Sequence, residues 1–177
     1  TTLFRSTRQL THKVRSENQA IMVSTNTVFL DNPSLTVRNW PGKNPTRIML
    51  DRTGRIPLHY AIFDQSVKTL VFTENPRENT DKVTYIFLHF DNMMLHNMLK
   101  IIASHGIHSV LVEGGSSLLN NFIASGLWDE ARTEVSDTII GNGVPAPVTD
   151  TAAEHVSMIN KHLYFIYSNR NKKFYHE

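Results

Sequence analysis

The stretch from Val110 to Asn121 holds the residues whose types and spacing best suit chemistry. An apolar run ends in the carboxylate Glu113, two glycines follow, and Ser116 and Ser117 then lead into a new apolar pattern. Glycines let a ligand approach the backbone closely, and the free N–H groups at a helix start favour phosphate. The pattern indicates a carboxylate beside an anion-binding turn. A plain strand–turn–helix connection fits the spacing equally well.

A second polar stretch, residues 24–27, directly follows the apolar run Ala20–Val23. In α/β proteins, ligands bind where the carboxyl ends of parallel strands meet. The serine and threonines of this stretch could therefore form a loop that binds phosphate or ribose. They could equally well cap a short helix expected at residues 28–30.

Apolar periodicity predicts the elements that must position these residues. Ser116 or Ser117 can cap the helix that follows them, and Gly126 can end it. For His12 and Arg15, a solvated helix face is the plain structural alternative to a functional role. Strands alternate with helices before strands run together, which predicts an α/β fold with a mainly parallel sheet flanked by helices and antiparallel strands at the end. The helices are expected at residues 2–18, 28–30, 92–105 and 116–125. The strands are expected at 20–23, 47–51, 69–73, within 83–90, and at 109–113, 129–137, 155–160 and 163–168, with a short extended segment at 35–38.

Composition excludes several classes of function. The 177 residues include no cysteine, so disulfides and cysteine-based metal sites are ruled out. A net charge of +2 is too small for a nucleic-acid-binding surface but suits a few basic residues that meet a phosphorylated small molecule. The nine histidines show no metal-binding spacing, and no apolar run approaches a membrane span. We therefore expect a cytoplasmic protein with no metal, nucleic-acid or membrane partner.

Several motifs together are similar to a known family. Residues 12–15, 20–23, 27–38, 50–52, 112–115 and 126–130 resemble, in order, the reductase domain of the bacterial bifunctional riboflavin-biosynthesis deaminase/reductase. The run from Thr27 to Arg38 combined with the Glu-Gly-Gly turn is the specific part. The resemblance implies a dihydrofolate-reductase-like fold in which residues 1–177 form a single reductase domain.

The resemblance also implies a reaction and a set of site residues. NADPH would donate hydride to C1′ of 5-amino-6-(5-phosphoribosylamino)uracil and open the ribose to a ribityl chain. Asp31 is the acid–base candidate, and the arginines suit the ribose phosphate because a guanidinium can bind it with two hydrogen bonds. The residues implied to bind the substrate are Arg15, Leu35, Arg38 and Glu113, and those implied to bind the cofactor are Thr27, Asp31, Gly115, Ser116, Ser117, Leu118, Leu119, Asn120 and Asn121.

The family's usual pattern also sets expectations about the rest of the protein. Its reductase domain opens with a strand that is absent here and follows a zinc deaminase domain, so we expect a fragment of a longer bifunctional enzyme. A homodimer is implied, with residues 129–137 as a candidate contact surface. Two alternatives remain open: a related reductase acting on the still-aminated pyrimidine or on folate, and a cofactor-binding or dimerisation module without catalysis.

Overall fold

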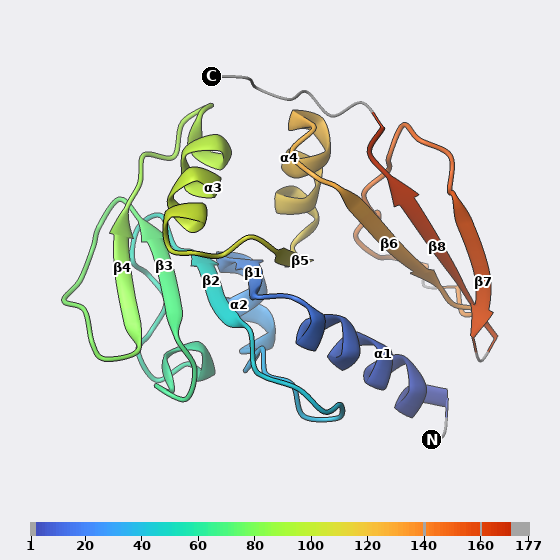
Figure 1. Cartoon of the computed structure of the whole chain (residues 1–177), viewed down its shortest axis with the longest axis horizontal. Helices are drawn as coiled ribbons and strands as arrows, with labels where there is room; N and C mark the ends of the chain where they lie inside the picture. Colours follow the sequence, from blue (N-terminus) through green and yellow to red (C-terminus); the bar gives the residue numbers. More distant parts are fainter. Residues whose placement is uncertain (1–2, 140, 160, 171–177) are drawn as a thin grey trace. The chain divides into compact units, whose positions relative to one another are not determined.

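A five-stranded parallel sheet organises the first of two units in the computed structural model, which describes residues 3–139, 141–159 and 161–170 (Figure 1). This unit ends at Gly115, and the second begins at Ser116. The strand order is β4-β3-β2-β1-β5, and each neighbouring pair is parallel. The strands are β1 (Ala20–Ser24), β2 (Thr46–Leu50), β3 (Thr69–Thr73), β4 (Val83–Phe87) and β5 (Val110–Gly114). All carboxyl ends therefore meet at one edge, with β1 between β2 and β5.

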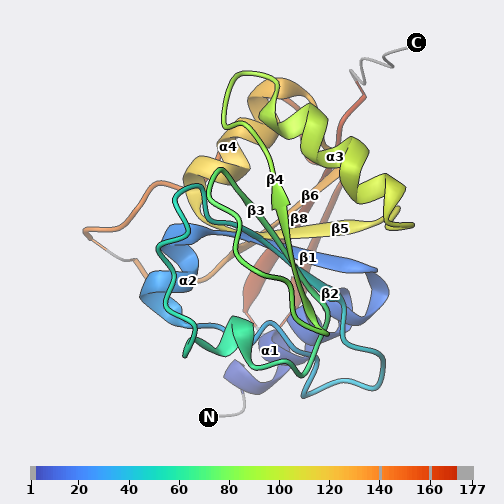
Figure 2. The same cartoon turned by 90° about the vertical axis from the view of Figure 1, so that its left-hand side faces the viewer.

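Helices cover both faces of this sheet. The long helix α3 lies on one face, and α2 and the short 3₁₀ helix η1 lie on the other (Figure 2). The inward residues of α3 are Leu95, Met98 and Ile102, whose spacing of three and four residues places them on one side of the helix. The helices of this unit are α1 (Leu3–Glu17), α2 (Thr25–Asp31), η1 (Ala61–Phe63) and α3 (Met94–Ser104).

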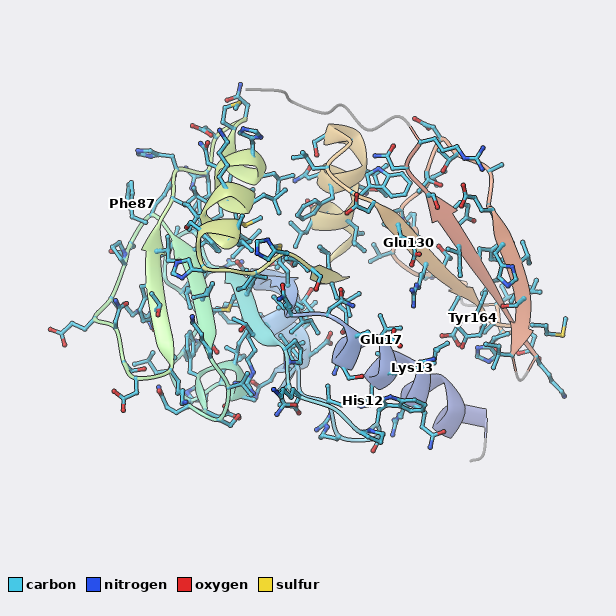
Figure 3. The ribbon with its side chains drawn as sticks, viewed as in Figure 1. His12, Lys13, Glu17, Phe87, Glu130 and Tyr164 are labelled. Carbon is cyan, nitrogen blue, oxygen red and sulfur yellow. The ribbon has the colours of Figure 1, made fainter. Side chains whose placement is uncertain are left out.

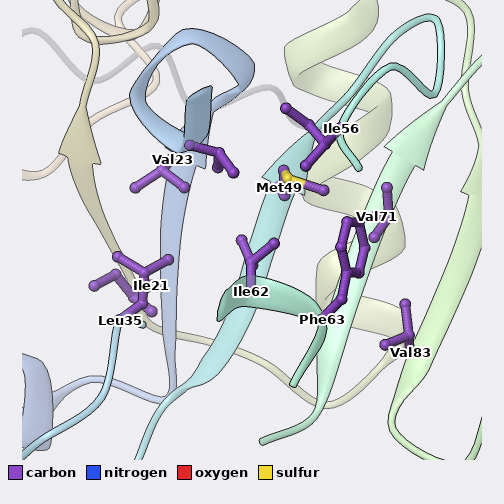
Figure 4. Close-up of a cluster of buried hydrophobic side chains, with 10 residues drawn as sticks. Ile21, Val23, Leu35, Met49, Ile56, Ile62, Phe63, Val71 and Val83 are labelled. Atoms are coloured by element: carbon purple, nitrogen blue, oxygen red, sulfur yellow. The ribbon is translucent and has the colours of Figure 1, made fainter. Parts of the chain in front are cut away.

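The core on the α2 side of the sheet consists of apolar side chains from alternate strand positions, from α2 and η1, and from the loops beside them (Figure 4). Successive strand residues point to opposite faces, so Ile21 and Val23 enter this cluster while Met22 is buried on the other face. The cluster comprises Ile21, Val23, Val28, Leu35, Met49, Ile56, Ile62, Phe63, Val71 and Val83.

One charged side chain is completely buried beside this cluster. The guanidinium of Arg47, on β2, is 0% exposed and donates to Asp64 Oδ1 at 2.7 Å and to the Ile62 carbonyl at 3.3 Å. Arg47 also donates to Ser66 Oγ at 3.2 Å. The bond from Arg47 to Asp64, together with the bonds that the Ser66 hydroxyl and N–H donate to Asp64 Oδ1, lowers the pKa of Asp64 from 3.8 to about 2. The pair fixes the segment that contains η1 to the sheet.

The second unit contains a helix and a three-stranded antiparallel sheet. Its elements are α4 (Ser116–Ser125), β6 (Glu130–Val135), β7 (His155–Ile159) and β8 (His162–Ser168), with strand order β6-β8-β7. Gly126 ends α4 at φ +71°, where its N–H and that of Leu127 bond to the carbonyls of Ile123 and Phe122. The predicted α/β fold, with a parallel sheet and antiparallel strands at the end, is confirmed.

Several local predictions were wrong. Residues 25–27 are helical, because Ser24 supplies the extended position before α2 and the Thr25 hydroxyl donates to the Leu50 carbonyl at the end of β2. Ser116 and Ser117 lie inside the first turn of α4, so neither occupies the capping position before it. By contrast, the strand expected within residues 83–90 is confirmed as β4, and the extended segment 35–38 lies outside both sheets. Among the described residues, no helix is long and apolar enough to cross a membrane.

Candidate active site

Arg15 on α1 and Glu113 on β5 form a two-pronged ion pair. Arg15 Nε donates to Glu113 Oε1 at 2.7 Å, and Arg15 Nη2 donates to Oε2 at 2.5 Å. The side chains are only 14% and 20% exposed. Such a fork fixes the orientation of both groups because it requires the planar guanidinium and carboxylate to align. Two residues implied to bind the substrate are thereby brought together.

The position of Glu113 follows from an irregularity in β5. In the pairing of β1 with β5, Met22 lies opposite Val112, but Val23 lies opposite Gly114. Glu113 is therefore the extra residue of a bulge and has no partner on β1. A bulge redirects the side chain it carries, which explains how a strand with apolar neighbours presents a carboxylate to α1.

The segment from Ser34 to Arg38 is held by side chains rather than by a strand. Arg15 Nη1 donates to the Thr36 carbonyl at 3.3 Å, and the Val37 N–H donates to Asn44 Oδ1 at 2.7 Å. The Arg38 N–H donates to His12 Nδ1 at 3.3 Å. Because these backbone groups are already satisfied, the segment needs no neighbouring strand. The Arg38 side chain itself is exposed.

His12 is buried and does not lie on a solvated face. It is 6% exposed and lies on α1 facing the neighbouring loop (Figure 3). Burial and the positive charges of Arg15 and Arg38 lower its pKa, and the Thr36 carbonyl and Glu113 oppose this only in part. His12 and Arg15 are three residues apart and share a helix face, and Arg15 is also mostly buried, so the solvated-face alternative is wrong for both.

The Gly114-Gly115 turn packs directly against the start of α2. The Gly115 N–H donates to Thr27 Oγ1 at 3.0 Å, and Ser24 Oγ lies 3.2 Å from the same oxygen. A Cβ at Gly115, where φ is +40°, would lie 2.7 Å from Ser24 Oγ. A Cβ at Gly114 would lie 3.1 Å from Thr27 Oγ1. Only glycine allows the end of β5 to approach α2 this closely.

The remaining residues implied by the resemblance are more dispersed. Asp31 is the exposed last residue of α2, one helical turn beyond Thr27 and on the same face. Leu35 is 2% exposed and has φ +52°, so its side chain belongs to the core and only its backbone can face a ligand. Residues 116–121 form the first part of α4 in the second unit.

Three arginines near the carboxyl ends of β2 and β3, to which the sequence motifs assign no role, are further candidates. Arg55 donates to Asn26 Oδ1 at 2.9 Å, and Arg52 donates to Glu74 Oε2 at 2.7 Å. Arg77 donates to backbone carbonyls of the loop that contains Arg55. A signal was present, because Arg52-Thr53-Gly54-Arg55 directly follows a predicted strand at the ligand-binding edge.

The other regions that the structure describes are weaker candidates for a functional site. A shallow hollow of about 500 Å³, lined by Gln65, Thr80, Asp81 and Lys82, precedes β3 and β4 in the chain and so lies at the opposite edge of the sheet. No group of three or more histidine, aspartate or glutamate side chains in the described ranges could hold a metal ion.

Comparison with curated proteins gives relatives of about one-third identity. The chain is 32% identical over 139 residues to the 2,5-diamino-6-ribosylamino-4(3H)-pyrimidinone 5′-phosphate reductase of Methanothermobacter thermautotrophicus, covering 73% of this chain and 64% of that protein. It is also 32% identical over 145 residues to the riboflavin biosynthesis protein RibD of Aquifex aeolicus, covering 79% of this chain and 41% of RibD. The chain thus spans less than two-thirds of either relative.

A solved structure and a family model agree with these relatives. The Thermotoga maritima diaminohydroxyphosphoribosylaminopyrimidine deaminase/5-amino-6-(5-phosphoribosylamino)uracil reductase superposes with a TM-score of 0.74 at 26% identity, over 90% of this chain and 47% of that one. The family model described as the RibD C-terminal domain matches residues 4–167. The chain therefore belongs to the RibD C-terminal domain family.

Proposed function

We propose that this chain is an NADPH-dependent reductase that converts 5-amino-6-(5-phosphoribosylamino)uracil into its ribitylamino product. The observation that carries the proposal is the arrangement of Arg15, Glu113 and the Arg38 segment around one buried histidine. The arrangement brings the guanidinium groups of Arg15 and Arg38 and the Glu113 carboxylate around His12, and Arg15 fixes the orientation of the carboxylate. Guanidinium groups suit a phosphate, and a carboxylate suits the N–H groups of a pyrimidine ring. The names of the relatives support the same reaction class.

The substrate roles follow from the hydrogen bonds that remain unused. Arg38 has an exposed guanidinium that can grip the ribose 5-phosphate with two parallel bonds. Each carboxylate oxygen of Glu113 accepts one hydrogen bond from Arg15, so its remaining lone pair can accept a bond from a pyrimidine N–H group. Arg15 would act chiefly by aiming this carboxylate and donating its remaining N–H groups.

The cofactor roles rest on the glycine turn and the sheet edge. In the first unit, the Gly115 N–H donates to the Thr27 hydroxyl in a tight turn. In the second unit, Ser116–Asn121 begin α4, and helix-start N–H groups suit a pyrophosphate. The bound NADPH would supply the hydride to C1′ of the substrate. Arg52 and Arg55, near the β2 carboxyl end, provide cations for the 2′-phosphate that distinguishes NADPH from NADH.

A second substrate is favoured by one specific observation. The reductase of M. thermautotrophicus, of which the chain covers 64%, is named for the aminated pyrimidine, whereas only 41% of A. aeolicus RibD is covered. The alternative function is thus reduction of 2,5-diamino-6-ribosylamino-4(3H)-pyrimidinone 5′-phosphate. The nicotinamide chemistry and the residues would be the same.

Oxidation of NADPH, followed by absorbance with each pyrimidine in turn, separates these functions. Turnover of the deaminated substrate supports the leading proposal, and turnover of the aminated one alone supports the alternative. Binding of NADPH without turnover of either would identify a non-catalytic module and contradict both. Folate serves as the negative substrate.

The assembly is part of the proposal. The T. maritima protein is named as both a deaminase and a reductase, and we infer that this chain corresponds to the reductase part of such a protein. On the small sheet, Val135, Leu163 and Met158 lie directly across neighbouring strands and are 45%, 36% and 71% exposed. This apolar row is suited to a homodimer contact. Sedimentation of a Val135→Lys, Met158→Lys variant tests it, and an unchanged mass would refute this contact.

A further inference from the structure

We propose that His12 is a positioning residue that holds the Arg38 segment in its substrate-binding conformation by accepting the Arg38 backbone N–H bond. This inference rests on the proposed function, because Arg38 is taken to grip the substrate phosphate. It assigns a role to the buried histidine of the His-Lys-Val-Arg stretch beyond that of its neighbour Arg15.

The geometry makes His12 the anchor nearest to the Arg38 side chain. Three side chains form hydrogen bonds with the backbone of residues 36–38. Arg15 binds the Thr36 carbonyl and Asn44 binds the Val37 N–H, whereas His12 binds the N–H of Arg38 itself at 3.3 Å. His12 is 6% exposed, so water cannot readily replace the bond. Loss of the bond would leave the segment fixed at Thr36 and Val37 but free to move where the phosphate is bound.

The bond requires a neutral imidazole. Nδ1 can accept only when it carries no proton, so the proton of neutral His12 must be on Nε2. The charged groups that face His12 are Arg15 on its own helix, Arg38 on the loop and Glu113 on β5. Protonation would add a third cation to a site with one carboxylate, and burial together with both arginines accordingly lowers the pKa of His12.

This arrangement couples phosphate binding to pH with a definite sign. Above its lowered pKa, His12 is neutral and accepts from Arg38. As the pH falls through that pKa, Nδ1 gains a proton, the acceptor is lost, and Arg38 becomes free to move while Thr36 and Val37 stay held. The Michaelis constant for the phosphorylated substrate should therefore rise on acidification, while kcat changes little because His12 touches no reacting atom.

Substitutions in the full chain can separate the acceptor from the charge. His12→Asn places an amide oxygen near the position of Nδ1 but cannot titrate, whereas His12→Leu removes the acceptor. His105→Leu, at an exposed histidine after α3, is the matched control. The KM and kcat for the pyrimidine substrate are measured from about pH 5.5 to 8, the range in which histidine titrates. Exchange of the Arg38 amide proton is measured in parallel by NMR.

We expect His12→Leu to raise KM about tenfold at neutral pH, as the loss of one buried hydrogen bond predicts. His12→Asn should keep the neutral KM and make its acidic rise smaller, leaving only the part caused by protonation of the substrate phosphate, whose second pKa is about 6. Arg38 amide exchange should accelerate in His12→Leu and stay slow in His12→Asn and in the control. If His12→Leu does not fold, His12→Gln, whose oxygen lies nearer the Nε2 position, takes its place.

Two results would overturn the proposal. One is an unchanged KM together with unchanged Arg38 exchange in the variant that lacks the acceptor. The other is an acidic rise in KM that is as steep in His12→Asn as in the wild type, because the titrating group would then be another residue or the substrate phosphate, whose second pKa is about 6. Failure of the wild-type chain to reduce either pyrimidine would refute the proposed function instead. The Arg38 exchange rates would still show whether His12 holds the segment.

Discussion

Glu113 accepts two hydrogen bonds from the guanidinium of Arg15, which lies 98 residues earlier in the chain. The pair joins α1 to the last strand of the parallel sheet, and a bulge in β5 turns the carboxylate toward it. The two charges largely neutralise each other, whereas the Arg38 side chain is exposed. Under the proposed function, the pair would orient the site and Arg38 would attract the substrate phosphate.

Replacing Glu113 by glutamine should weaken both the fold and substrate binding. Glutamine keeps one acceptor oxygen but leaves the mostly buried Arg15 without a counter-charge, and we expect a loss of about 1–3 kcal/mol in the free energy of unfolding. Urea titration measures it, and the KM for the pyrimidine should rise. The control is Glu17→Gln, which breaks the exposed Lys13–Glu17 pair at 3.8 Å and should cost less than about 0.5 kcal/mol. Equal losses in the two variants would contradict this account.

Replacing Gly115 by alanine should damage the turn proposed to bind the cofactor. The new Cβ would lie 2.7 Å from Ser24 Oγ at a residue with φ +40°, so it adds a clash to backbone strain. We expect a loss of about 2 kcal/mol or more in unfolding free energy, and a higher KM for NADPH. Gly106→Ala isolates the strain, because Gly106 has φ +75° with nothing within 4 Å of its Cβ position, and should cost about 1 kcal/mol. A milder effect at Gly115 than at Gly106 would show that the packing is looser than described.

The sequence predicted those elements whose borders are marked by breakers or by a switch of periodicity. The strand at 69–73 and the helix at 116–125 match β3 and α4 residue for residue. Prediction from the sequence failed where contact with a residue far along the chain decides the burial or the local structure of a residue. His12 is buried because Thr36 and Arg38 cover it, and the Leu50 carbonyl accepts a hydrogen bond that draws Thr25 into α2. Such partners lie far along the chain, so local pattern cannot supply them.

The same limit applies to the candidate site. Motif resemblance selected Arg15 and Glu113 separately, but their mutual ion pair depends on a one-residue bulge that no periodicity signals. Leu35 was selected as a ligand contact, yet its left-handed backbone turns the side chain into the core. A left-handed leucine is uncommon, and such strain tends to gather at functional sites.

Acidification should weaken the anchor between Arg47 and Asp64. The pKa of Asp64 is lowered from 3.8 to about 2 in the folded chain, so its stabilising contribution is complete above about pH 4 and disappears as the pH falls toward 2. Asp64→Asn should lose about 1–2 kcal/mol at neutral pH, a reduced value because the Asp64 side chain is 40% exposed and solvent screens it. Urea unfolding of both proteins between about pH 2 and 6 measures the difference, which should shrink toward the acidic end. A constant difference would exclude this ion pair as its source.

Asp31 is the residue through which proton transfer can be tested directly. It lies exposed at the end of α2, one turn from Thr27, where a carboxyl could exchange protons with a substrate or water. If it serves as the acid or base, Asp31→Asn should lower kcat by about 10²-fold or more and remove one limb of the pH–rate profile. Asp137→Asn, at an exposed residue after β6, is the control. Unchanged turnover at all pH values would assign Asp31 to binding or to the surface.

Cofactor preference should depend on the arginines that follow β2. Arg55 is oriented by Asn26 and by the ring of Phe29, 5.2 Å from its guanidinium carbon, while Arg52 is paired with Glu74. A 2′-phosphate near this loop would gain one or two charge-assisted hydrogen bonds that NADH cannot form. Replacing both arginines by glutamine should therefore raise the KM for NADPH about tenfold or more and leave that for NADH nearly unchanged. Arg132→Gln, at an exposed arginine on β6, controls for the lost charge. Equal weakening toward both cofactors would place the 2′-phosphate elsewhere, since only NADPH carries that group.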